Sequence, residues 1–260
     1  MRTSILEISN LVKSYPGGSR VLDGVNFSVR KGSICGFLGL NGAGKSTTIR
    51  ILAGLTSRDS GDITFDGKSI DDHRDFFKQR AGFVLDSPLY FDWMSGEEYL
   101  SFVGMMYGLR GQEGEKRIDE LLEFFDLESV AEDPISTYSS GLKKKISLSA
   151  AMIHAPELLV LDEPLESIDP LALRSIKDSL LLMARKGGTV LITSHILDSI
   201  ERLCDDVAII HRGTVILESS VDNVKKKVKN GISNEKFSSL EELFVDLVAQ
   251  KGSRQKLSWL

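Results

Sequence analysis

The amino-acid sequence predicts an α/β fold: a mostly parallel β-sheet core, an antiparallel β subdomain at the N-terminus and an inserted helical subdomain. Three observations lead to this prediction. Short apolar, β-prone runs alternate with helical patterns, which is typical of parallel strands covered on both faces. Alternating apolar and polar residues near the N-terminus indicate half-buried antiparallel strands. From residue 88 to about residue 155 the pattern changes to helical periodicity.

The N-terminal region predicts two antiparallel strands. Residues 5–8 and 24–29 alternate apolar and polar side chains, and the Tyr-Pro-Gly-Gly run at 15–18 is a turn signal between them. The next elements expected along the chain are a strand at 33–38, a helix at 46–53, and strands at 62–65 and 81–85.

The later elements follow the same reasoning. Helical periodicity predicts helices at 96–107 and 116–125, and apolar runs then predict strands at 158–161, 189–192 and 207–210, with a helix at 171–185 between the first two. Near the C-terminus, Leu240, Leu243, Phe244 and Leu247 have helical spacing, so an amphipathic helix packed on the main body is expected.

These patterns indicate one large domain over residues 1–220, followed by a helical tail over residues 221–260. Within the large domain, residues 1–86 and 157–220 are expected to form the sheet core with its β subdomain, and residues 87–156 to form the helical insert.

Composition excludes some classes of function. The net charge of -5 disfavours a general polyanion binder, because nucleic-acid affinity comes mainly from lysines and arginines that neutralise phosphates. No nucleic-acid partner is therefore expected. Cys35 and Cys204 match neither a zinc spacing nor a disulfide framework, which predicts two reduced core thiols.

The chain is expected to work in the cytosol. The first 15 residues lack the continuous apolar stretch of a signal peptide. No stretch of about 18 consecutive apolar residues occurs, so no membrane-spanning helix is expected.

A glycine-rich run at residues 39–47, Gly-Leu-Asn-Gly-Ala-Gly-Lys-Ser-Thr, fits the P-loop pattern G-x-x-x-x-G-K-[ST] between an expected strand and an expected helix. Its backbone N–H groups would surround phosphate oxygens, with the N-terminus of the helix adding positive charge. Lys45 would reach the β- and γ-phosphates, and Ser46 would coordinate Mg²⁺. The expected nucleotide contacts are Gly39, Asn41, Gly42, Ala43, Gly44, Lys45, Ser46 and Thr47. Alone, the motif indicates any P-loop NTPase, including kinases and GTPases.

Two acids follow the apolar run at 158–161. Such a strand places Asp162 and Glu163 at the carboxyl edge of the sheet, where ligands of open α/β sheets bind. Asp162 would hold Mg²⁺ directly or through water, and Glu163 would orient and deprotonate the attacking water. The alternative is a strand that merely ends in charged residues.

Three further positions add specificity. His195 ends the run Ile-Thr-Ser-His after an expected strand, Asp169 stands in the run Ser-Ile-Asp-Pro, and Tyr15 follows the first strand. Together with the P-loop and the two acids, these residues resemble the nucleotide-binding domains of ABC transporters over about residues 3–220. The resemblance implies a RecA-like P-loop NTPase core. It also implies that His195 is the switch histidine at the γ-phosphate, that Asp169 belongs to the D-loop at the dimer interface, and that Tyr15 stacks on adenine. The alternative for Tyr15 is a core tyrosine at a strand end.

The family's signature motif is close to Leu-Ser-Gly-Gly-Gln, and this chain has Tyr-Ser-Ser-Gly-Leu at 138–142, so Ser139 and Gly141 match while Ser140 and Leu142 depart. In the family this motif reaches the ATP held by the other subunit, which suits a hydroxyl and N–H groups at a helix N-terminus. The Tyr-Ser-x-Gly form is similar to that of drug and antibiotic exporter ATPases. The three lysines that follow are either functional or a solvated helix face.

A second departure is Asp86, at the position where the family usually has a glutamine that touches Mg²⁺ and moves with the membrane partner. Asp86 keeps an oxygen for the metal but adds a charge. The segment at 87–94, Ser-Pro-Leu-Tyr-Phe-Asp-Trp-Met, is rich in aromatic residues. It is expected either to dock on a membrane subunit or to pack within the helical insert.

The resemblance implies an ATP-hydrolysing subunit that uses ATP and Mg²⁺ and powers a separate permease, with export as the expected direction. It would lie at the inner face of the membrane. Two copies, or this chain and a related subunit, would close head to tail around two ATP molecules. Lys45, Glu163 and His195 would form the catalytic set.

Other classes stay open at this stage. A non-transport ABC ATPase that acts as a conformational clamp on ribosomes or DNA usually has two such domains or long coiled-coil insertions. A regulatory subunit with weak hydrolysis is consistent with Asp86 and the altered signature. A GTPase or small-molecule kinase would need neither the signature motif nor His195.

Overall fold

The computed structural model describes residues 3–87, 90–166, 168–195, 197–224 and 240–249. Among them a larger, mostly parallel sheet has the strand order β10-β9-β3-β8-β7-β6, and a smaller antiparallel sheet has the order β2-β1-β4-β5. The strands of the larger sheet are β3 (Ile34–Leu38), β6 (Ala81–Val84), β7 (Leu158–Leu161), β8 (Thr189–Ser194), β9 (Asp206–His211) and β10 (Thr214–Ser220). The smaller sheet contains β1 (Ser4–Ser14), β2 (Arg20–Arg30), β4 (Ser60–Phe65) and β5 (Lys68–Ser69).

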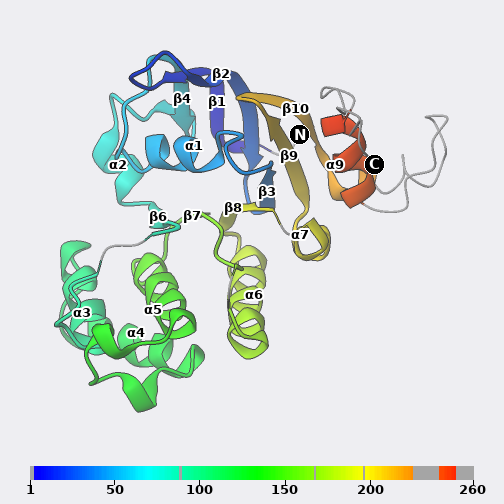
Figure 1. The fold of residues 1–260 in the computed structure, drawn as a ribbon. Helices are drawn as coiled ribbons and strands as arrows, with labels where there is room; N and C mark the ends of the chain where they lie inside the picture. The colour runs from blue at the N-terminus through cyan, green and yellow to red at the C-terminus, as the bar shows by residue number, and fades with distance from the viewer. Residues whose placement is uncertain (1–2, 88–89, 167, 196, 225–239, 250–260) are drawn as a thin grey trace.

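The helices lie in several places around the two sheets. Figure 1 shows α3, α4 and α5 gathered in one lobe beside β6 and β7, whereas α1 lies between the two sheets. The helices are α1 (Lys45–Leu52), α2 (Arg74–Lys78), α3 (Gly96–Met106), α4 (Gly111–Phe124), α5 (Ser140–Met152), α6 (Pro170–Arg185), α7 (Leu197–Leu203) and α9 (Leu240–Ala249), with 3-10 turns at η1 (Glu128–Val130) and η2 (Ile135–Thr137). The predicted α/β class, the antiparallel N-terminal strands and the parallel core are confirmed.

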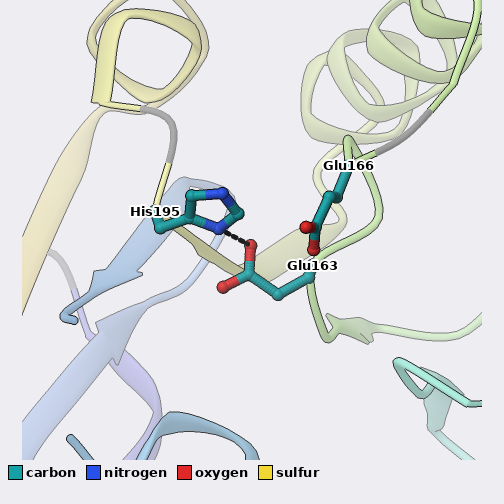
Figure 2. A group of neighbouring side chains, drawn as sticks. All are labelled: Glu163, Glu166 and His195. Carbon is teal, nitrogen blue, oxygen red and sulfur yellow. Dashed lines mark hydrogen bonds and ion pairs between the residues drawn. The ribbon is translucent and has the colours of Figure 1, made fainter. Parts of the chain in front are cut away.

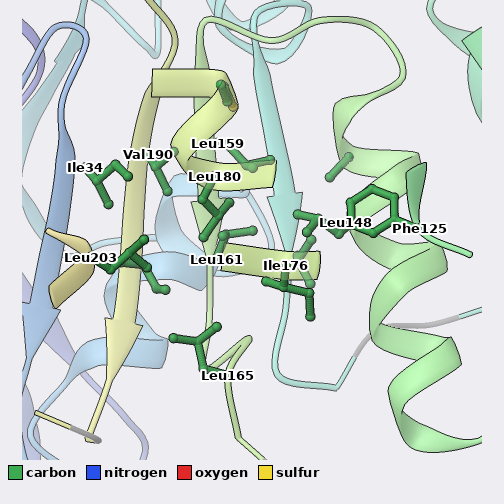
Figure 3. Packing of buried hydrophobic residues seen from close by; sticks show 14 of the residues in the cluster. Ile34, Phe125, Leu148, Leu159, Leu161, Leu165, Ile176, Leu180, Val190 and Leu203 are labelled. Atoms are coloured by element: carbon green, nitrogen blue, oxygen red, sulfur yellow. The ribbon is translucent and has the colours of Figure 1, made fainter. Parts of the chain in front are cut away.

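The core alternates across the larger sheet. Leu159 and Leu161 of β7 pack in the hydrophobic cluster that includes α5 and α6, whereas Leu158 and Val160 pack in the cluster on the other side, against the smaller sheet. Successive strand residues point to opposite faces, so one apolar strand serves both clusters. Figure 3 shows the first cluster, in which Leu161 lies near Ile176 of α6. This packing fixes β7 and therefore the position of the residues that follow it.

The helical insert docks closely on the larger sheet. An added Cβ at Gly82 of β6 would collide with the backbone carbonyl of Ala151 in α5, so only glycine permits this approach. Ser95 begins α3 with a capping box, because its hydroxyl accepts the N–H of Glu98 and the Glu98 carboxylate accepts the N–H of Ser95.

Several elements go beyond the sequence prediction. β8 runs to Ser194 rather than ending at residue 192, and α4 begins at Gly111 rather than at residue 116. The sequence analysis did not predict β10. It pairs with β9 through a turn at Arg212 and Gly213, where both residues have positive φ, as two-residue hairpin loops require. The sequence analysis also did not predict β5, α2 and α7, because these elements are too short for periodicity to identify.

Two other predictions concern single side chains. Cys35 and Cys204 are buried and are not joined in a disulfide. They belong to different hydrophobic clusters, which confirms that they are core thiols. Phe244 of α9 is buried, with Leu243 and Leu247 partly buried against the main cluster, so the amphipathic C-terminal helix is confirmed over its described residues. The side chain of Leu240 lies outside the described set. Among the described helices, none combines the length and apolar character needed to cross a bilayer.

Candidate nucleotide site

Three loops meet where β3, β7 and β8 end. These strands are parallel neighbours, so their carboxyl ends lie at the same edge of the sheet. The P-loop follows β3, Asp162 and Glu163 follow β7, and His195 follows β8. The fold therefore brings together three segments that are separated by more than 30 residues along the chain.

The P-loop curls tightly and borders a groove. Gly42 and Gly44 have φ of 77° and 117°, which L side chains rarely adopt. A Cβ at Gly39 would lie 2.6 Å from the backbone oxygen of Ile210. The groove has a volume of about 340 Å³ and is lined by Val21, Leu40, Asn41, Gly42, Gly44, Lys45, Ser46, Thr47, Asp86, Glu163 and Glu166. Most of the predicted P-loop contacts thus face it, while Gly39 and Ala43 shape the loop behind.

Lys45 is a buried cation at the base of this groove, with 5% of its side chain exposed. Its Nζ donates to the carbonyl of Gly39 at 2.7 Å and lies 3.3 Å from Oε1 of Glu163. A buried ammonium group needs such oxygen partners, because each unpaired charge would be costly away from water. The arrangement places one positive charge where phosphate oxygens would enter.

Asp162 is buried beside two hydroxyl groups. The Thr193 hydroxyl donates to Oδ1 at 2.6 Å, and the Ser46 hydroxyl is near enough to act on the same carboxyl. Burial raises the pKa of the Asp162 carboxyl, the carboxylates of Asp86 and Glu163 add to this, and the hydrogen bonds to Thr193 and Ser46 oppose it. The predicted pair Ser46 and Asp162 is therefore in contact.

Glu163 forms the centre of the site. Figure 2 shows its carboxylate turned toward the imidazole of His195, with Glu166 beside them. The Oε2 atom of Glu163 lies 3.1 Å from Nδ1 of His195. Ligand atoms of these three residues all lie within 4.8 Å of one another. Glu163 also has a left-handed backbone conformation, with φ of 48°. An acid, an imidazole and the Lys45 amine thus converge around one space, as a site for general-base chemistry requires.

Asp86 borders the same groove and a second cavity. It is exposed, and it lines both the groove of the P-loop and a cavity of about 200 Å³ beside the N-terminal half of α5. Its charge acts on the pKa values of Asp162 and Lys144. The structure therefore places Asp86 between the groove and the helical insert.

The signature residues lie apart from this groove in the same chain. Ser139 is the N-cap of α5, where its Oγ accepts the N–H of Leu142 at 3.3 Å. Asp169 is the N-cap of α6, and hydrogen bonds from the N–H groups of Ala172 and Leu171 hold the pKa of its carboxyl below the usual value. A Cβ at Gly141 would lie 3.0 Å from Oδ2 of Asp169. Ser139, Gly141 and Asp169 thus form one surface, while Ser167 falls outside the described residues.

Tyr15 stands in the turn between β1 and β2. Its side chain is 37% exposed and lies under the Lys13 ammonium group, which is 5.5 Å from the ring centre. It is not a core tyrosine. It is also absent from the described lining of the groove, to which the same hairpin contributes Val21.

Three residues at the site were missed by the sequence reasoning. Thr193 bridges Asp162 and Glu163, Glu166 lines the groove, and Lys144 of α5 donates from its Nζ to the backbone carbonyls of Glu163, at 3.3 Å, and Glu166. Burial lowers the pKa of Lys144, and the carboxylates of Glu166, Asp86 and Glu163 oppose this. The hydroxyl within the Ile-Thr-Ser-His run and the lysine triplet were the available signals.

Comparisons with known proteins agree with this geometry. The family model described as ABC transporter matches residues 22–166. The chain is 41% identical over 212 residues to the linearmycin resistance ATP-binding protein LnrL of Bacillus subtilis (strain 168), covering 82% of this chain and 68% of that one. It is 34% identical over 226 residues to the bacitracin transport ATP-binding protein BcrA of Bacillus licheniformis, covering 86% and 72%. A solved structure titled "Structure of ATP binding subunit of ABC transporter" has a TM-score of 0.84 at 32% identity, covering 94% of this chain and 99% of that one.

Proposed function

Since the chain belongs to the ABC transporter family as an ATP-binding subunit that hydrolyses ATP, we propose that Lys45, Glu163 and His195 are its catalytic residues. The observation that supports this most strongly is that Glu163, which lines the groove, contacts both of the other residues. Glu163 lies 3.3 Å from the Lys45 amine and 3.1 Å from the His195 ring. These are the charges needed to hold a γ-phosphate and to take a proton from water.

The hydrolysis step follows from these contacts. ATP enters the groove, and its phosphate oxygens accept the backbone N–H groups of the P-loop and the Lys45 amine. Phosphate then replaces Glu163 as the partner of Lys45, which leaves the Glu163 carboxylate free to accept a proton from the attacking water. The water oxygen bonds to the γ-phosphorus while the bond from that phosphorus to the β–γ bridging oxygen breaks, and ADP and inorganic phosphate leave. His195 interacts with the γ-phosphate, and Tyr15 stacks on the adenine. The remaining P-loop contacts are those predicted: Gly39, Asn41, Gly42, Ala43, Gly44, Ser46 and Thr47.

The residues around Ser46 fit Mg²⁺. The Ser46 hydroxyl acts on the nearby Asp162 carboxyl, and Ser46 and Asp86 line the same groove, so hydroxyl and carboxylate oxygens come together there. Such hard oxygen ligands are those that Mg²⁺ prefers. We assign Ser46, Asp162 and Asp86 as its protein ligands, directly or through water. When bound, the ion would neutralise charge on the β- and γ-phosphates.

A second ATP-binding subunit completes each site. Ser139, Gly141 and Asp169 lie together on α5 and α6 but do not line the described groove. The exposed N-cap of α5 offers a hydroxyl and a positive helix end, which suit a phosphate presented from outside. A head-to-tail homodimer or related heterodimer therefore uses the P-loop of one chain and Ser139 of the other.

Subunits of this family pair with permeases, and the aromatic segment beside α3 suits that contact. Trp93 is 73% exposed and packs on Phe91, which packs on Phe102. Tyr90 instead turns inward and bonds Ser147. The segment thus divides between packing and exposure, and Pro88 and Leu89 lie outside the described residues. We place the permease at the exposed part, which locates the chain at the inner face of the membrane.

The names of LnrL and BcrA favour export of a drug-like compound.

In this proposal residues 1–220 form the ABC ATPase domain. Residues 1–86 and 157–220 provide the RecA-like core and β subdomain, residues 87–156 the helical insert, and residues 221–260 the tail. The insert connects the permease contact with the signature surface.

The test is Glu163→Gln, with Glu157→Gln as matched control. Glu157 precedes the other end of β7 and pairs with Lys31 and Arg80, so the same change there spares the groove. We expect Glu163→Gln to lower ATP hydrolysis by at least about 100-fold and to accumulate an ATP-bound dimer in size-exclusion chromatography. If Glu163→Gln hydrolyses ATP at the wild-type rate, Glu163 is not the general base.

A further inference from the structure

A single buried hydroxyl connects the strand that carries His195 to the two acids. β7 ends at Leu161, which pairs with Ile192, and β8 continues for two more residues. Thr193 therefore stands beside Asp162, where the shorter strand has already turned away. Its side chain is fully buried, with 0% exposed, so its hydroxyl makes its contacts away from bulk water.

The Thr193 hydroxyl is both a hydrogen-bond donor and a hydrogen-bond acceptor. Its Oγ1 donates to Oδ1 of Asp162 at 2.6 Å and accepts the backbone N–H of Glu163 at 2.9 Å. A hydroxyl is one of the few groups that donates and accepts at the same atom. Valine has the same shape, but it would leave a buried carboxylate oxygen and a buried N–H without this partner.

The neighbouring contacts show why this matters for Glu163. Its φ of 48° is uncommon for a residue with a side chain and persists only where the surroundings hold it. Thr193 holds its N–H, and His195, two residues farther along, contacts its carboxylate at 3.1 Å. Both ends of Glu163 are thus fixed from the end of β8.

We propose that Thr193 is a positioning residue for ATP hydrolysis, which aligns the Glu163 carboxylate and the Asp162 oxygens through its two hydrogen bonds. This rests on the proposed role of Glu163 as the base. The residue would act through Glu163 and Asp162 and would not itself touch ATP. Its loss should therefore lower kcat and raise the Mg²⁺ concentration needed for half-maximal rate, while leaving the KM for ATP nearly unchanged.

The experiment uses the full chain with Thr193→Val, Thr193→Ala and Thr193→Ser. Alanine and serine both lack the γ-methyl and differ only in the hydroxyl, so their comparison isolates it even if the valine variant does not fold. We expect kcat to fall about 10- to 100-fold in Val and Ala, and serine to restore it to within about fivefold of the wild type. The KM for ATP should change by less than about threefold.

The inference would be overturned by a kcat of the Ala and Val variants within about threefold of wild type, or by a Ser variant as impaired as Ala. A loss seen only in KM or in the melting temperature would also overturn it, since it would make Thr193 merely structural. Glu163→Gln distinguishes a failure of the proposed function from a failure of the role of Thr193. If that variant hydrolyses ATP normally, the proposed function fails; if it is inactive while Thr193→Ala is fully active, only the role of Thr193 fails.

Discussion

Two buried lysines, one in the nucleotide groove and one in the helical insert, are stabilised in different ways. Lys45 is 5% exposed and Lys145 is 9% exposed by side chain. Lys45 has a carbonyl at 2.7 Å and the nearly buried carboxylate of Glu163. Among the described residues, Lys145 pairs with the carboxylate of Asp126 at 3.5 Å, and that side chain is 79% exposed. The groove holds its charge among fixed, buried partners, whereas the insert relies on a partner that water screens. Mutations should therefore affect chemistry in the first region and stability or coupling in the second.

The largest expected effect is that of Lys45→Met. It removes the amine that would bind the β- and γ-phosphates and leaves Glu163 with fewer partners. We expect ATP hydrolysis to fall by at least about 100-fold, because a preorganised donor to developing charge is lost. Steady-state hydrolysis and binding of a fluorescent ATP analogue measure this.

Lys145→Met is the control, because it removes an equally buried amine from the insert. Its hydrolysis rate per folded molecule should stay within about fivefold of the wild type. Equal losses of hydrolysis in the two variants would contradict the contrast between the two regions.

The accuracy of the sequence prediction follows the same division. The P-loop, Asp162, Glu163 and His195 are each local patterns at strand ends, and parallel strand pairing alone brings them to one edge. Their meeting could therefore be predicted. The role of Thr193 could not be predicted, because it depends on β8 extending two residues beyond the end of β7. Periodicity does not define where paired strands end relative to each other. Strand boundaries are decided by neighbours in the sheet rather than by the strand's own residues.

The helical insert was harder to predict for a related reason. The lysine triplet at 143–145 reads as a solvated face, yet Lys145 is buried and Lys144 contacts backbone carbonyls of the segment after β7. Long side chains extend far from their helix, so their partners are set by tertiary packing.

Lys144→Met should have an intermediate effect. Its Nζ joins α5 to the carbonyls of Glu163 and Glu166, so its loss releases the insert from the segment that follows β7. We expect kcat to fall about 5- to 20-fold, as for the loss of charge-assisted hydrogen bonds, with nucleotide binding retained.

Lys143→Met removes the same charge one residue earlier on α5 and serves as the control. A rate for Lys144→Met equal to that of Lys143→Met would show that only the general charge of the helix matters.

Trp93→Ala should leave the isolated subunit almost unaltered. With 73% of its side chain exposed, Trp93 adds little to folding, and we expect a change in unfolding free energy below about 0.5 kcal/mol. Its removal should instead weaken recovery of the tagged chain with membranes of its source cells. Met106, also 73% exposed and at the other end of α3, provides the control Met106→Ala. Equal recovery of both variants would argue against the aromatic segment as the permease contact.

The smallest expected effect is a pH dependence of stability in the insert. Burial lowers the pKa of His154 to about 4, and its ring stacks on Tyr107 at 3.7 Å. Above pH about 6.5, imidazole is neutral in both folded and unfolded chains and contributes no pH dependence. Between about pH 6.5 and 4 the unfolded chain takes up a proton that the folded chain does not, so the free energy of unfolding falls as the pH falls.

His154→Phe keeps an aromatic ring but cannot titrate, so its melting temperature should fall less between pH 7.5 and 5 than that of the wild type. Discounted for the partial exposure of the ring, we expect a difference of roughly 2–4 °C. His73→Phe, at an exposed histidine before α2, should follow the wild-type profile. If His154→Phe also follows it, the imidazole is protonated as readily in the folded chain as in the unfolded one.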